Sequence, residues 1–207
     1  MADNPALYGF RWKQSRFGSG LPNIEYFPVA SAYQWAPGGV SVDLNVGDPV
    51  KKVNDGTVAG VAAGDATFGI VATIAPYYNG TAMVRGKSLP GGTTYGSNLE
   101  RQSFVGIILL AGNIFECVCD DAVTFTTQAT YTAAIGENVD VSINQVSGST
   151  LATPKLDISL HETGGASRVW RIVGLSKTPN IDFSGANVPL LVTGNLVQEA
   201  PDQTTSV

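Results

Sequence analysis

The feature that most constrains the fold is a succession of short apolar runs separated by turn residues, among them 24 glycines and 11 prolines. Val40–Leu44 alternates apolar and polar residues with a period of two, which is typical of a half-buried strand. Asp55 and Gly56 stand between the runs Val50–Val53 and Thr57–Val61. This arrangement predicts a β-hairpin with a type I′ turn, because glycine accepts a positive φ.

Similar runs continue to the end of the chain. Ser103–Leu110 is almost continuously apolar, so we expect a strand buried on both faces. One short helix is predicted over Thr126–Ile135, ending at Gly136. Further strands are expected at residues 68–74, 81–85, 114–119, 139–143, 156–160, 167–175 and 188–192. The fold class predicted is all-β: a single β-barrel or jelly-roll-like sandwich with one short helix and an extended N-terminal arm.

The chain is divided into three parts by composition. Residues 1–32 are predicted to be an N-terminal arm, because their glycines and prolines break any long helix. Within the arm, Tyr26–Ala30 is expected to be an extended edge segment. Residues 33–198 are predicted to form the β-barrel body, and residues 199–207 a polar C-terminal tail.

The charge balance and the length of the apolar runs disfavour two classes of partner, nucleic acids and membranes. The net charge is −5, whereas a general nucleic-acid binder is expected to be basic. Residues 1–22 carry three bases and one acid, net +2, and the rest carries nine bases and sixteen acids, net −7. No apolar run approaches the roughly 18 residues of a membrane span, and no secretory signal is visible. We therefore expect no nucleic-acid or membrane partner and a site of synthesis in the cytoplasm.

Residues suited to catalysis or metal binding are scarce. The single histidine, His161, has no local pattern of a hydrolytic triad around it. Cys117 and Cys119 are expected to be reduced and partly buried in a strand, because their spacing suits neither a disulfide nor a zinc site. Glu116 and Asp120 would share a strand face, but a solvated strand end is the favoured interpretation. The sequence thus predicts no enzyme, no cofactor and no metal.

The arm carries the candidate binding residues. Its aromatic residues alternate with bases, and exposed aromatics beside arginines are typical of interface anchors. The alternative is that these aromatics cover one end of the core. The residues selected for binding another protein or a sister subunit are Phe10, Arg11, Trp12, Lys13, Arg16 and Phe17.

Several body segments resemble the head decoration, or cement, proteins of tailed bacteriophages. The first segment, Val46–Gly56, is followed by Gly69–Val71, and Ile114–Val118 comes later. The threonine-rich turn at 126–136 and the closing segment Val169–Asn180 are similar to the later half of that family. The resemblance covers roughly residues 40–197 and leaves the arm outside it.

The resemblance implies a β-barrel or jelly-roll-like virion protein without catalytic residues. Such proteins bind the outer capsid surface, commonly as trimers, and brace neighbouring capsomers. The implied partners are the major capsid protein and further copies of this chain, in a homotrimer. Two alternatives stay open: another virion component, such as a tail or fibre module, or a carbohydrate-binding β-sandwich that would use Trp35, Tyr77 and Tyr78.

Overall fold

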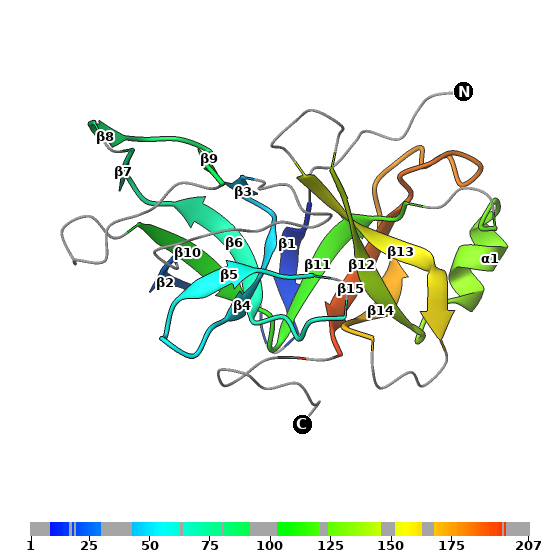
Figure 1. Cartoon of the computed structure of the whole chain (residues 1–207). Coiled ribbons are helices and arrows are strands. Elements are labelled where there is room, and N and C mark those ends of the chain that lie inside the picture. The colour runs from blue at the N-terminus through cyan, green and yellow to red at the C-terminus, as the bar shows by residue number, and fades with distance from the viewer. Residues whose placement is uncertain are drawn as a thin grey trace.

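Two antiparallel sheets make up most of the molecule and lie side by side in the computed structural model (Figure 1). The structure describes residues 9–16, 18, 20–29, 43–62, 64–79, 81–91, 103–120, 124–145, 152–162, 168–195 and 197. Residues 1–8 and 198–207, which include the whole predicted tail, lie outside the described residues, as does most of the strand expected over 40–44.

The larger sheet has six strands in the order β1-β11-β15-β14-β12-β13. Neighbouring strands in it are antiparallel. The helix α1 (Gln128–Ala133) lies at the far end of this half of the molecule (Figure 1). The strand bounds are β1 (Arg11–Ser15), β11 (Asn113–Val118), β15 (Pro189–Gly194), β14 (Trp170–Leu175), β12 (Asn138–Gln145) and β13 (Ala152–Glu162).

The smaller sheet has five strands in the order β2-β10-β6-β4-β5. Two short ribbons, β3 with β9 and β7 with β8, extend from the same half of the molecule (Figure 1). The bounds are β2 (Ile24–Pro28), β10 (Phe104–Leu109), β6 (Gly69–Ile74), β4 (Pro49–Lys52), β5 (Val58–Gly60), β3 (Leu44–Asn45), β9 (Ser88–Leu89), β7 (Tyr77–Tyr78) and β8 (Met83–Val84).

The predicted fold class is confirmed: the chain is all-β with one short helix. Each sheet begins and ends on a different strand, so within the described residues neither sheet closes into a barrel. Of the two architectures expected, the sandwich is therefore the one that describes the molecule. The segment predicted as an arm, residues 1–32, contributes β1 to one sheet and β2 to the other, and Phe10 within it is 4% exposed.

Strands β6 and β10 of the five-stranded sheet contribute side chains to both apolar clusters of the molecule. Ile70 and Ile108 belong to the apolar cluster under the six-stranded sheet. Their neighbours Val71 and Ile107 belong to a second cluster, on the other side of the five-stranded sheet. Because side chains alternate between the faces of a strand, both faces of β6 and β10 are buried. This confirms the expectation for residues 103–110.

The predicted β4–β5 hairpin is present, but its turn is not of the expected type. The Gly56 amide donates to the carbonyl of Val53 at 2.9 Å, and Val53 donates to Thr57 at 2.8 Å. Gly56 has φ +82°, whereas neither Asn54 nor Asp55 has a positive φ. A type I′ turn needs positive φ at both central residues, so this loop is instead the longer kind closed by a left-handed glycine.

Asp48 is a buried carboxyl group in the turn that enters β4. It is 1% exposed, and the amide of Asn45 donates to its Oδ2 at 2.7 Å. The pKa of Asp48 is raised to about 8, mainly by burial; the hydrogen bonds from Asn45 oppose this rise, and the charge of nearby Asp43 adds a smaller part of it. A raised folded-state pKa contributes stability below the unfolded value, near 4, that is lost as the pH rises through about 8.

We predict that Asp48→Asn flattens the pH dependence of stability. Between pH 5 and pH 8 the wild-type protein should lose stability by as much as about 1.4 kcal/mol per pH unit, the limit for one proton. The asparagine variant should lack most of this decline, because its side chain is neutral at every pH. Urea unfolding at several pH values measures the effect. Asp55→Asn is the control, since Asp55 is almost fully solvated, and an equal decline in wild-type and Asp48→Asn proteins would contradict the prediction.

Candidate interaction surface

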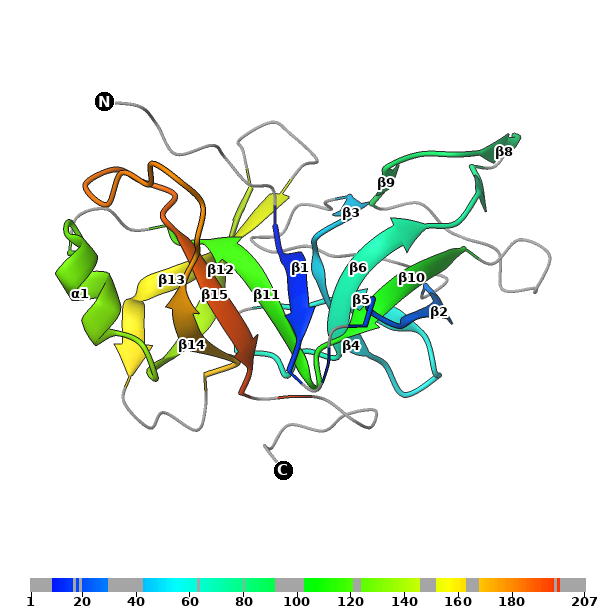
Figure 2. The ribbon, with the colours of Figure 1, turned by 180° about the vertical axis from the view of Figure 1, so that it is seen from behind.

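Strand β1 places the predicted binding residues at the edge of the six-stranded sheet. Among the described residues its one partner strand in that sheet is β11, with Arg11 opposite Glu116 and Trp12 opposite Phe115. Figure 2 shows β1 in the middle of the molecule, beside the five-stranded half. Arg11 and Arg16 are exposed, and within the described part of the chain neither forms an ion pair.

The aromatic residues of the segment are placed differently from its bases. The ring of Phe10 stacks on that of Trp170 with centroids 4.2 Å apart, and its amide donates to Gly47 at 2.8 Å. Trp12 is half-buried against the same core, and its indole N–H donates to Asn113 Oδ1 at 2.9 Å. Phe10 is thus a core residue and not a docking residue, and Trp12 anchors β1. Phe17 lies outside the described residues.

Lys13 is held by a buried carboxylate. The register of β1 against β11 shifts between Trp12 and Gln14, so Lys13 occupies the irregular position. Its Nζ lies 2.9 Å from Oε1 of Glu116, whose side chain is 1% exposed. The Ser176 hydroxyl donates to the other carboxylate oxygen. Sequence analysis selected Lys13 but missed Glu116 as its partner, because β1 and β11 are about a hundred residues apart along the chain.

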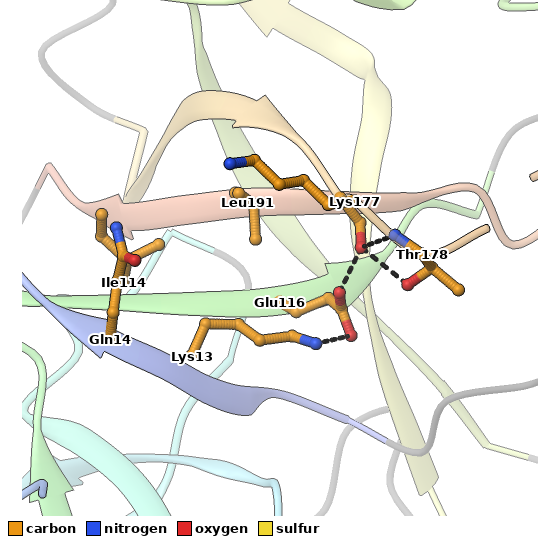
Figure 3. Close-up of a pocket in the computed structure, with 8 residues that line it drawn as sticks. Lys13, Gln14, Ile114, Glu116, Lys177, Thr178 and Leu191 are labelled. Carbon is orange, nitrogen blue, oxygen red and sulfur yellow. Dashed lines mark hydrogen bonds and ion pairs between the residues drawn. The ribbon is translucent and has the colours of Figure 1, made fainter.

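An open pocket of about 450 Å³ lies over this ion pair (Figure 3). Lys13 and Lys177 lie on opposite sides of it, and Gln14 and Ile114 lie at the end away from Glu116 (Figure 3). The residues that line it are Lys13, Gln14, Ile114, Glu116, Ser176, Lys177, Thr178 and Leu191. A second hollow, lined by residues 12–16 with Gly18 and Gly20, shares Lys13 and Gln14 with the first. The two hollows therefore adjoin at β1.

The second edge strand, β2, exposes apolar side chains. Tyr26 within the strand is 59% exposed, and Leu21, three residues before the strand begins, is 91% exposed. Tyr26 lies opposite Gly106 of β10, where an added Cβ would come within 2.8 Å of Ile24. Sequence analysis predicted an edge segment here but did not select these residues for binding. The alternation of Ile24 and Tyr26 on an edge strand was the signal that could have identified them.

Other residues considered from the sequence lie apart from this surface. His161 packs edge-on against Phe125, and its Nε2 lies 3.5 Å from Glu137. Tyr77 is 7% exposed, which removes it from the aromatic platform considered for sugar binding, and Trp35 lies outside the described residues.

The residues of the acidic and cysteine segment also have separate surroundings. The expectation of a solvated strand end is wrong for Glu116, which is 1% exposed and contacts Lys13. Asp120 lies near Asp157, and burial followed by that neighbouring charge raises the pKa of Asp120. Cys117 and Cys119 are free thiols, as expected, but both are fully buried and not partly buried. Among the described residues there is no group of three or more histidine, cysteine or acidic side chains placed to hold a metal ion.

Comparison with known proteins identifies no relative: no family model, no curated protein and no solved structure matches this chain. Within the described parts of the chain, no helix has the length and apolar character needed to span a membrane.

We predict that Phe10→Ala destabilises the protein strongly, whereas Arg11→Ala does not. Removing the Phe10 ring leaves a cavity against Trp170, which typically costs about 3–5 kcal/mol. Arg11 is exposed, so its removal should change the unfolding free energy by less than about 0.5 kcal/mol. Chemical denaturation of both variants measures the difference. Equal stabilities would show that β1 is not anchored through the core.

Proposed function

We propose that this chain is a structural virion protein that binds the outer surface of a bacteriophage capsid and stabilises contacts between major capsid protein subunits. The observation that carries the proposal is the course of residues 10–28. This one segment supplies an edge strand to both sheets, with exposed bases on β1 and exposed apolar side chains on β2. Edge strands that present such side chains are typical of surfaces that a partner covers.

The charge distribution supports a protein partner. The first 22 residues carry a net charge of +2, and the remainder carries −7. A basic edge on an acidic body favours one orientation against an acidic surface and disfavours binding to nucleic acid. The family resemblance of the body supplies the identity of that surface as the capsid exterior.

A homotrimer is part of the proposal. Only 14% of the residues are charged, against roughly 25% in an average globular chain. Association of copies would cover exposed apolar side chains such as Leu21 and Tyr26. Three linked copies on a symmetric shell would also gain avidity without strong individual contacts.

The edge of β1 can be tested by charge removal without disturbing the core. Deleting residues 1–20 would remove Phe10 from the core, so point substitutions are the cleaner choice. We predict that the double variant Arg11→Gln/Arg16→Gln binds undecorated phage heads about tenfold more weakly than wild type, because interface charges contribute to specific association. Co-sedimentation with heads measures the affinity, which should also fall with increasing salt.

The matched control is Arg85→Gln/Lys87→Gln, which removes the same charge from exposed positions between β8 and β9. This control should bind like wild type. Equal binding by wild type and both double variants would refute docking through β1. Equal weakening in the two double variants would show that binding to the heads depends on the net charge of the protein and not on the position of the bases on β1.

A further inference from the structure

We infer that the pocket over Glu116 binds a carboxylate carried on a short aliphatic stem, such as the side chain of a glutamate in the protein partner. The chemistry follows from the pocket itself, and only the identity of the partner rests on the proposed function. Three groups define the site: Lys177, Gln14 and the Glu116–Lys13 pair. The sequence did not predict that these groups lie around one pocket.

The carboxylate of Glu116 is not available to attract a cation. Lys13 occupies Oε1 at 2.9 Å, and the Ser176 hydroxyl donates to Oε2. The side chain of Glu116 is 1% exposed, so it lies beneath the pocket and is neutralised there. Its effect is to hold Lys13 and Ser176 in place, which makes it a positioning residue.

The two hydroxyl groups beside it are also committed. Ser176 has a single proton, which it gives to Glu116, so its oxygen must accept the other two contacts. These come from the amide of Thr178 at 3.2 Å and from the Thr178 hydroxyl at 2.8 Å. Neither hydroxyl therefore keeps a proton with which to bind a ligand.

The donors that remain are cationic or amide groups. Lys177 is exposed, and within the described residues it has neither an ion pair nor a side-chain hydrogen bond. The side-chain amide of Gln14 likewise makes no hydrogen bond to the described residues. Lys13 carries three ammonium protons and forms an ion pair with Glu116 on one side only. Two ammonium groups against one carboxylate leave the pocket positive, so it selects an anion.

The side chains that line the pocket favour a carboxylate over a phosphate. Ile114 and Leu191 are half-buried and offer apolar surface beside the donors (Figure 3). A phosphate would be better served by an arginine or a run of free backbone amides. Among the residues that the structure describes, no arginine lines the pocket, and the backbone amide of Thr178 already donates to Ser176. An anion with an aliphatic stem, a carboxylate, fits these donors and walls.

The test compares two probes of matched shape and opposite charge. Butyrate and butylammonium are titrated into the full-length protein with 13C-labelled methyl groups, and the signals of Ile114 and Leu191 are followed by NMR. We expect butyrate to shift both signals saturably and butylammonium to leave them unchanged. Lys177→Gln should bind butyrate about fivefold more weakly, as for a partly solvated ion pair. The control Lys87→Gln, an exposed lysine outside the pocket, should bind like wild type.

Shifts with butylammonium, undiminished butyrate binding by Lys177→Gln, or no shift with either probe would overturn the inference. A second arm uses acetylated and amidated pentapeptides, Gly-Gly-Glu-Gly-Gly and its glutamine counterpart. Binding of the glutamate peptide alone supports a partner side chain, whereas butyrate binding without peptide binding overturns that assignment. The Arg11→Gln/Arg16→Gln variant keeps every pocket residue, so it should still bind butyrate even where head association is lost. This separates failure of the pocket from failure of the proposed function.

Discussion

The stacking of Phe10 on Trp170 is the contact on which the arrangement of this surface depends. This contact fixes the start of β1 against the core. Two residues further on, the indole N–H of Trp12 donates to Asn113 and attaches β1 to the start of β11. With these two rings turned inward, Arg11 and Arg16 remain at the surface, on a segment that is hydrogen-bonded to β11 and its turn and is not a free tail. A strand already paired in a sheet loses less conformational entropy on binding than a disordered one, which favours docking through this edge.

The buried Glu116 links this strand to the rest of the six-stranded sheet. It joins Lys13 of β1 to Ser176, which follows β14, so residues distant in sequence meet at one point. A buried carboxylate is tolerated only when it is paired and hydrogen-bonded, and here both oxygens have partners. The same contacts that stabilise the carboxylate shape the adjacent pocket and leave Lys177 facing solvent.

The sequence predicted those elements whose signals are local. The apolar runs over 68–74 and 103–110, the Asp55-Gly56 hairpin and the threonine-rich helix before Gly136 each lie within about ten residues, and the corresponding elements are present. Strand pairing could not be predicted in this way. Nothing near Phe10 indicates that its ring meets Trp170, and the pattern of bases and aromatics in the segment fits a free arm as well as an edge strand. The same limit applies to Lys13 and Glu116, whose contact exists only because β1 pairs with β11.

The central claim is that a protein surface of the capsid covers the edge strand β1. Cryo-electron microscopy of the wild-type protein incubated with undecorated heads of the phage that encodes it tests this claim directly. The account predicts density for the protein on the outer shell, with β1 and the bases Arg11 and Arg16 facing a capsid subunit. Particles that stay bare at saturating protein concentration, or a bound protein whose β1 faces solvent, would contradict it.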